Sequence, residues 1–325
     1  MNIRSQTPSV IAATDRDLLV RASRLYYLEE RGQAEIAALL GISRAGVSRL
    51  LQRARDEKIV EIRVREPAGG GDWSALERRL GIKELHVATE GGIEAVGSLA
   101  ARYFERAVRN RDVIGLTAGT TLSAFVQAVK PSRRLHLEIV PLVGALWDTG
   151  EDFDGSFLCQ ELRRRTGGTH RVLSAPAVVR DATLVRSLRS EPRVRSVIER
   201  YGAVRCAFLG IGEAAESHPN VVAARAASPS GPRASRTRPT LPRGAVASVG
   251  CLFFDAGGQP CVSTLDRRTI GISHAELRSV PVRVGLAAGA RKLAATLALA
   301  RGGVLDVLIV DAPLARQLRE AVNGA

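Results

Sequence analysis

A short turn rich in glycine and threonine carries the most suggestive chemistry in the chain. Gly119, Thr120 and Thr121 follow an apolar run at 113–116, and a helical spacing of apolar residues begins at Leu122. A turn between a strand and a helix presents backbone amides, and here also two hydroxyls, at the positive end of the helix dipole. Such groups bind anions, typically phosphate. A plain structural turn is the alternative, because turns of this composition are common between strands and helices.

Other reactive side chains do not gather along the sequence. The four cysteines contain no Cys-x-x-Cys pair, and the five histidines are scattered singly. We therefore expect free thiols in a reducing cytoplasm, no metal site, no cofactor and no catalytic residues.

Composition limits the class of protein. The 325 residues are 45% apolar, enough for two or three domains with cores of their own. The net charge of +14 favours an anionic partner, either nucleic acid or a phosphorylated ligand. The sequence contains neither an apolar run long enough to cross a membrane nor an apolar signal segment at its start, which favours a cytoplasmic protein without a membrane partner.

The first 66 residues have the pattern of a helix-turn-helix domain. Apolar spacing predicts a first helix that ends near Gly32, a short second helix at 33–40 and a third at 44–57. Gly41 and Ser43 suit the tight turn between the last two, since glycine accepts a positive φ and serine caps a helix. A short strand is expected at 59–64.

The third helix has a polar face that suits DNA. Arg44, Ser48, Arg49, Gln52 and Arg53 lie opposite its apolar stripe. Arginine pairs with guanine and glutamine with adenine in the major groove, and all five side chains can reach phosphates. A solvated helix face is the alternative, but the short preceding helix and the turn favour DNA binding.

A glycine-rich linker at 67–72 separates this head from residues 73–325, where strand and helix patterns alternate. This order predicts a doubly wound, mostly parallel α/β domain, whose ligands bind beyond the carboxyl ends of the strands. The expected strands are 84–88, 113–116, 137–144, 172–176, 204–212, 282–287 and 304–310. The stretch 213–244 is rich in proline and arginine and predicts a long basic loop.

With the head, linker and α/β body in this order, the chain resembles the SorC family of sugar-responsive bacterial transcriptional regulators. The segments that carry the resemblance are 34–37, 41–44, 47–51, 114–121, 140–144, 175–177, 253–255, 266–272 and 289–292.

The resemblance implies an effector domain similar to glucosamine-6-phosphate deaminase and an oligomer, usually a tetramer, on operator DNA. It also implies a phosphosugar effector, with Gly119, Thr120 and Thr121 holding the phosphate and Asp266 and Lys292 as polar contacts. On the residues alone, Asp266 would be read as part of a surface ion-pair cluster and Lys292 as a solvated helix residue.

Several residues depart from the family pattern around the expected pocket, namely Ala118, Ser248, Ala288 and Arg291. They keep open a regulator that has lost its ligand and acts as a DNA-binding oligomer. A second alternative is a sugar-phosphate isomerase or deaminase with an appended DNA-binding head. We predict an effector-controlled regulator that is not an enzyme.

Overall fold

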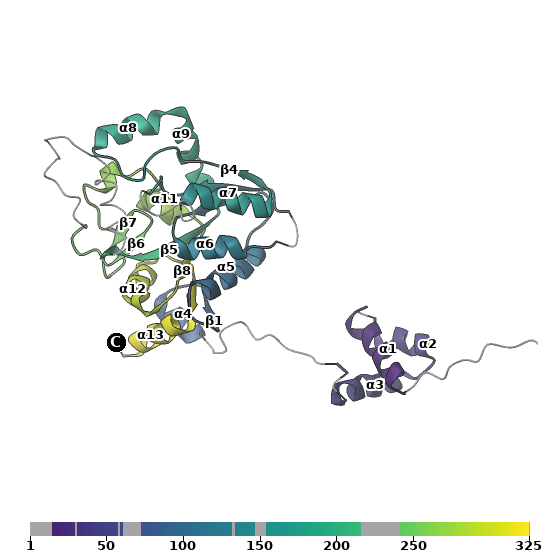
Figure 1. Cartoon of the computed structure of the whole chain (residues 1–325). Helices are drawn as coiled ribbons and strands as arrows, with labels where there is room; N and C mark the ends of the chain where they lie inside the picture. The colour runs from purple at the N-terminus through teal and green to yellow at the C-terminus, as the bar shows by residue number, and fades with distance from the viewer. Residues whose placement is uncertain are drawn as a thin grey trace, which may run out of the picture. The chain divides into compact units, whose positions relative to one another are not determined.

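The computed structural model describes residues 15–29, 31–57, 59–60, 73–131, 134–146, 154–215 and 241–324. The chain divides into two compact units, residues 1–65 and 66–325, which are described separately (Figure 1). Some sequence-based expectations fall mainly on other residues. Most of the strand at 59–64, the linker at 67–72 and most of the basic loop at 213–244 lie outside the described part of the chain.

Three helices form the N-terminal unit: α1 Asp15–Tyr27, α2 Gln33–Leu40 and α3 Arg44–Asp56. Gly41 ends α2 with a φ of 66°, a conformation that glycine adopts without strain. Ser43 caps α3, because its hydroxyl accepts a hydrogen bond from a backbone amide three residues later. Ile36, Val47 and Leu51 pack together as the core. The predicted helix-turn-helix is confirmed, with α1 ending earlier than expected.

A sheet organises the second unit. Its parallel strands follow the order β1-β9-β8-β5-β2-β3-β4, and β6 and β7 continue from the end of β5 as antiparallel strands. The bounds are β1 Glu84–Ala88, β2 Val113–Leu116, β3 Leu137–Pro141, β4 Gly168–His170, β5 Cys206–Glu213, β6 Ala247–Val249, β7 Leu252–Phe254, β8 Val282–Ala287 and β9 Val307–Asp311. The mostly parallel α/β architecture is thus confirmed.

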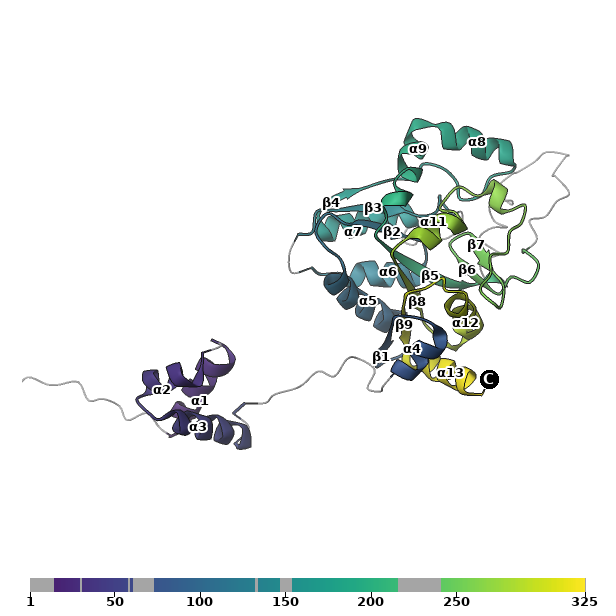
Figure 2. The same cartoon turned by 180° about the vertical axis from the view of Figure 1, so that it is seen from behind.

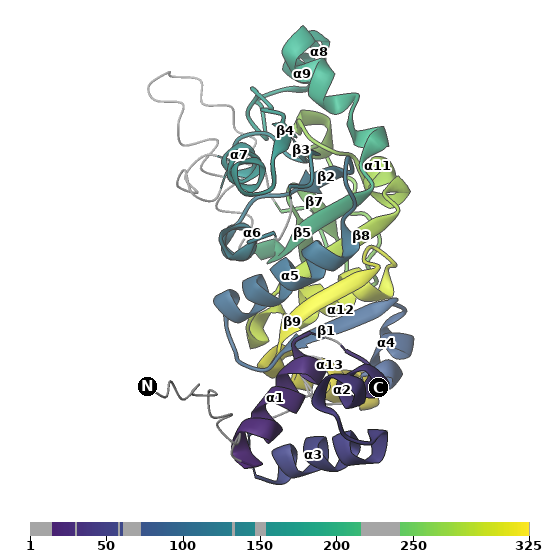
Figure 3. The same ribbon diagram turned by 90° about the vertical axis from the view of Figure 1, so that its right-hand side faces the viewer.

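Helices cover both faces of this sheet, as Figure 3 shows for α5, α6 and α7 on one side and α4 and α11 on the other. On the first side Phe104, Phe125 and Phe208 pack ring against ring. On the second side Tyr201 and Leu299 belong to a separate apolar cluster. The helices are α4 Ser74–Leu80, α5 Ile93–Ala107, α6 Thr120–Ala128, α7 Gly155–Thr166, α11 His274–Ser279, α12 Leu293–Arg301 and α13 Ala312–Asn323.

The predicted strand at 172–176 is wrong. The chain leaves the sheet after β4, and Ala175 and Ala177 instead exchange backbone hydrogen bonds with Ala145, in the loop that follows β3. Two short helices, α8 Ala182–Ser190 and α9 Pro192–Ile198, follow this segment and can be seen from behind in Figure 2.

Candidate functional site

Three of the parallel strands end in the same kind of turn. Gly92 follows β1, Gly119 follows β2 and Gly289 follows β8, and each is the N-cap residue directly before the next helix. Their φ angles are 103°, 125° and 90°, which a residue with a Cβ adopts only with strain. Since the strands are parallel, all three turns lie at the carboxyl edge of the sheet, where α/β proteins bind their ligands.

The chain fills two of these turns with a carboxylate of its own. Oδ2 of Asp311, the last residue of β9, accepts hydrogen bonds from the amides of Gly92 and Gly289, both at 3.0 Å. Oδ1 accepts from the Leu314 amide at 3.1 Å and so caps α13. Asp311 is 1% exposed. Sequence reasoning missed this residue, although Asp-Ala-Pro after an apolar strand is a recognisable helix start.

The third turn is different. Among the described residues, no side chain accepts a hydrogen bond from the amides of Gly119, Thr120 or Thr121. Thr120 is exposed and Thr121 is half-buried. A Cβ added at Gly119 would meet no atom within 4 Å, so open space adjoins the turn. The first turn of α6 therefore presents free amides, two hydroxyls and the positive end of a helix dipole.

Asp266 begins the 3-10 helix η3 (Asp266–Arg268), and its carboxylate is held on two sides. Oδ2 accepts from the Ser263 amide at 2.7 Å, and Oδ1 lies 3.5 Å from Nε2 of His274. Burial raises the pKa of Asp266, but the contacts with His274 and Ser263 outweigh it and hold this pKa below its usual value. The carboxylate is therefore ionised at neutral pH, and His274 is a neighbour that the sequence did not indicate.

Lys292 ends η4 (Ala290–Lys292), the 3-10 turn that follows Gly289, and it is half-buried. Beside it, Nε of Arg291 lies 3.9 Å from Oε1 of Glu213 at the end of β5. Sequence reasoning did not single out Glu213, whose approach depends on the neighbouring positions of β5 and β8.

The structure brings the predicted effector residues to one edge of the sheet. The segment after Asp266 pairs with the end of β3, since the Gly144 amide donates to the Ile270 carbonyl at 3.0 Å. The Gly119 turn lies at the end of β2 and Lys292 beyond the end of β8, with β5 between them. Two strand spacings are about 10 Å, which is the scale of a small sugar phosphate.

The DNA-contact residues predicted on α3 all lie on its exposed side. Arg53 is already engaged, because its guanidinium contacts Asp15 of α1 at 2.8 Å and Glu57 at 2.9 Å. Both hydrogen bonds raise the pKa of Arg53, and the hydrogen bond to Asp15 contributes more than the one to Glu57. Gln52 donates to Asp56. Arg44, Ser48 and Arg49, in the first half of α3, are therefore less engaged in side-chain contacts within the domain than Gln52 and Arg53 are.

Comparison with known protein families agrees with this arrangement. A family described as "Putative sugar-binding domain" matches residues 73–319, and one described as "Sigma-70, region 4" matches residues 24–57. The chain belongs to this sugar-binding family. The resemblance to SorC regulators is confirmed.

Two curated relatives match almost the whole chain. The Deoxyribonucleoside regulator of Bacillus subtilis is 29% identical over 311 residues, covering 93% of this chain and 97% of that protein. The Sorbitol operon regulator of Klebsiella pneumoniae is 24% identical over 316 residues, covering 94% and 98%. These relatives are transcriptional regulators, which agrees with the class of protein predicted for this chain.

A solved structure shows the same fold. The full-length Sorbitol Operon Regulator SorC from Klebsiella pneumoniae has a TM-score of 0.68 at 22% identity, and the match covers 94% of this chain and 99% of that one. The expected likeness to glucosamine-6-phosphate deaminase stays a prediction. Within the described ranges, no helix is long and apolar enough to span a bilayer.

Proposed function

We propose that this chain is a cytoplasmic, carbohydrate-responsive transcriptional regulator whose affinity for operator DNA is set by a phosphorylated sugar. The contrast among the three glycine turns supports an effector site at the Gly119 turn. Asp311 occupies the amides of Gly92 and Gly289, whereas the Gly119 turn has amides to offer. An external anion at Gly119 would have the role that the Asp311 carboxylate has at the other two turns.

The remaining residues fit the rest of such a ligand. Amides of the first turn of α6, with the hydroxyls of Thr120 and Thr121, would hold the phosphate. The ionised Asp266 would accept hydrogen bonds from sugar hydroxyls, and the ammonium of Lys292 would pair with the phosphate or with a carbonyl-derived oxygen. No step in this scheme breaks a bond, so the protein senses its ligand and does not act as an enzyme.

At the other site, α3 would lie in the major groove of the operator. Arg44, Ser48, Arg49 and Gln52 would contact bases and phosphates, while Arg53 would hold α3 against α1 as well as facing the DNA. An oligomer, a tetramer or otherwise a dimer, would place several heads on one operator. Effector binding would then alter their arrangement, which is a linkage between the two sites.

A thermal-shift screen of phosphorylated sugars tests the effector site. The double variant Thr120→Val, Thr121→Val removes two hydroxyls and is expected to lose most of the rise in Tm given by the effector. Thr183→Val is the matched control, since Thr183 lies in the first turn of α8, where Asp181 already accepts from its amide. A full ligand shift in the double variant would remove the Gly119 turn from the site.

Operator binding at a fixed salt concentration tests the head. Arg49→Ala is expected to weaken specific binding about tenfold or more, as the loss of a base-contacting arginine does. Arg21→Ala is the control, because Arg21 is an exposed arginine of α1 and lies outside the face of α3 that is assigned to DNA. Equal losses in the two variants would count against the assigned contact face.

A further inference from the structure

The two halves of α3 differ in charge. The first half carries Arg44 and Arg49 and has no carboxylate. The second half has two arginines, with one carboxylate at its end, one directly after it and one contributed by α1. These residues are Arg53, Arg55, Asp56, Glu57 and Asp15. A phosphate backbone therefore attracts the first half of the helix more strongly than the second.

Arg53 lies at the centre of the second half. Its Nη2 is 2.8 Å from Oδ2 of Asp15 and 2.9 Å from Oε1 of Glu57. Its Nε donates to the same Glu57 oxygen at 3.0 Å. A guanidinium uses these same N–H groups when it pairs with a phosphate or with the edge of a guanine. While both carboxylates hold it, Arg53 brings little positive charge to DNA.

The two carboxylates differ in where they come from. Glu57 is four residues from Arg53 and moves with α3, whereas Asp15 belongs to α1, which packs against α3 (Figure 3). The Asp15 contact therefore fixes the direction of the Arg53 side chain relative to both helices. The Arg53 and Asp15 side chains are 48% and 68% exposed, so a DNA phosphate can reach this pair and compete with Asp15 for the guanidinium.

Such a contact affects two kinds of DNA binding differently. Binding to unrelated sequences depends almost entirely on cations that neutralise phosphates. Selection of one sequence depends on base contacts made by a helix in a fixed orientation. A carboxylate that neutralises an arginine therefore weakens the first kind of binding. Because Asp15 also ties α1 to α3, it supports the second.

We propose that Asp15 is a specificity-determining residue of the DNA-binding head, which withholds Arg53 from the phosphate backbone and so lowers the affinity for unrelated DNA. Asp15 itself touches no DNA and acts as a positioning residue through Arg53. Specificity gained by penalising the wrong partner is a general device of binding proteins. The inference rests on the proposed function, since it takes α3 to be the helix that enters the major groove.

The affinities of the full-length protein for two duplexes of equal length test this. One duplex has a mixed sequence, and the other is the duplex that the wild-type protein selects most tightly from a randomised library. Asp15→Asn should raise the affinity for the mixed-sequence duplex about threefold, the scale of an exposed ion pair. The affinity for the selected duplex should not rise, so the ratio of the two affinities falls about threefold.

The salt dependence provides a readout that a purely structural role would not change. With its charge released, Arg53 can neutralise a further phosphate. The plot of log affinity against log salt concentration for the mixed-sequence duplex should therefore become steeper in Asp15→Asn, by up to about one. Damage to the head would lower both affinities and could not produce a gain on one duplex.

Two controls separate the Arg53 contact from a general effect of charge. Glu29→Gln also removes one carboxylate from the head and frees an arginine, since Oε2 of Glu29 lies 3.8 Å from Nε of Arg31, outside α3. It should leave the affinity ratio of the two duplexes unchanged. In an Arg53→Gln background, Asp15→Asn should give no more gain than Glu29→Gln gives.

A second pair of variants tests the same point with Asp15 in place. Because Arg53 is withheld from phosphates, Arg53→Gln should lower the affinity for the mixed-sequence duplex less than about twofold, whereas Arg49→Gln should lower it about threefold or more. Equal losses in these two variants would overturn the inference even if Asp15→Asn did not fold.

The outcomes also distinguish this inference from the function on which it rests. An equal gain on both duplexes, no gain in folded Asp15→Asn, or a gain that persists without Arg53 would each overturn the role of Asp15, while the proposed function stands. If the wild-type protein binds neither kind of duplex, or selects no sequence from the library, the assignment of the head to operator DNA fails, and the role of Asp15 fails with it.

Discussion

At the amino ends of the strands, carboxylates are paired with side-chain cations, whereas at the carboxyl ends the main partners are backbone amides. Asp306, before β9, contacts Arg283 at 2.8 Å and Lys83 at 2.9 Å. Asp112, before β2, contacts Arg205 at 3.1 Å. Glu138 of β3 similarly binds two arginines.

The carboxyl edge carries charge of another kind. Asp311 is surrounded by amide donors, and the Gly119 turn adds amides from which no side chain in the described part of the chain accepts a hydrogen bond. Charges on the amino edge balance one another within the fold, so they stabilise it and leave little for a ligand. At the carboxyl edge, the amides of the Gly119 turn are the groups that we propose bind an external anion. Net charge alone, +14 for this chain, could not have separated the two edges.

The largest expected effect is the loss of the Asp311 carboxylate. Asp311→Ala would leave three buried or half-buried amides without their acceptor and should lower the free energy of unfolding by roughly 3 kcal/mol or more. Urea unfolding followed by circular dichroism measures this. Asp255→Ala is the control, since Asp255 accepts amides only within its own exposed turn. A comparable loss of unfolding free energy in Asp255→Ala would contradict the expectation that Asp311 contributes more to stability than an aspartate in an exposed turn.

The second largest effect is expected from acid, which should weaken the ion pairs at the amino edge of the sheet and so lower stability. Burial raises the pKa of Asp306, but hydrogen bonds from Arg283 and Lys83 outweigh it, and the pKa is lowered. Burial also raises the pKa of Glu138, but the hydrogen bonds from Arg200 and Arg171 outweigh this effect, and the pKa is lowered. A carboxylate whose pKa is lower in the folded state than in the unfolded state stabilises the fold. This stabilisation is fully present above the pKa of the unfolded state, about 4, and is lost as the pH falls through the pKa of the folded state.

The double variant Asp306→Asn, Glu138→Gln tests this origin. It should start less stable at neutral pH and lose less of its unfolding free energy than the wild type between pH 5 and pH 3, flanking the ordinary carboxyl pKa of about 4. Equal slopes for the two proteins would assign acid sensitivity to other groups.

A pair of glycine variants compares the turns directly. Gly119→Ala and Gly289→Ala each place a Cβ in open space at a positive φ, so each should cost about 1 to 2 kcal/mol of stability from backbone strain. Only Gly119→Ala should also lose the rise in Tm given by millimolar inorganic phosphate at constant ionic strength. The same loss in Gly289→Ala would mean that the two turns are equivalent.

The smallest effect is expected at Lys83, on the rim of the amino edge. Its side chain is 70% exposed, and Asp306 keeps Arg283 when the ammonium is removed. Solvent screening should hold the cost of Lys83→Ala to about 0.5 kcal/mol or less. A loss above 1 kcal/mol in urea unfolding would show that this exposed pair is stronger than such pairs usually are.

The sequence predicted those features that depend on near neighbours. Helix α2 was predicted with its observed bounds, because Gly32 and Gly41 mark its ends and apolar spacing fixes the rest. The strand before Gly119 and the helix after it were also found, since the turn residues separate two clear periodicities. The site at this turn was predicted as a hypothesis, and its contrast with the Gly92 and Gly289 turns was not foreseen.

What the sequence could not provide depends on pairing over long distances. Asp311 meets Gly92 across 219 positions of the chain, and only the order of the strands brings them together. The strand expected at 172–176 failed for the same reason, because Ala175 found its partners in the loop after β3. Arg53 has helical spacing suited to DNA, but its pairing with Asp15 follows from the packing of α1 against α3.

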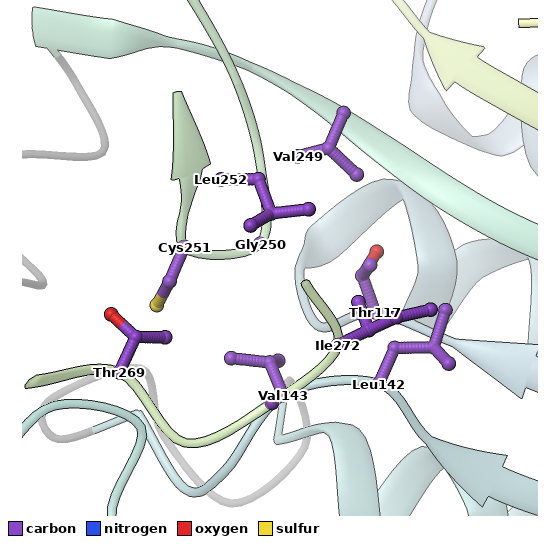
Figure 4. A pocket seen from close by; sticks show the side chains of 10 residues that line it. Thr117, Leu142, Val143, Val249, Gly250, Cys251, Leu252, Thr269 and Ile272 are labelled. Atoms are coloured by element: carbon purple, nitrogen blue, oxygen red, sulfur yellow. The ribbon is translucent and has the colours of Figure 1, made fainter. Parts of the chain in front are cut away.

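Strand β5 links the turn between β6 and β7 to the middle of the parallel sheet. Its first residues, from Cys206 to Gly210, pair with β8 in the parallel sense, and its last, from Ile211 to Glu213, pair with β6 in the antiparallel sense. Because one continuous strand takes part in both pairings, a shift of the turn at Gly250, which lines a small pocket (Figure 4), would be carried along β5 into the core of the sheet.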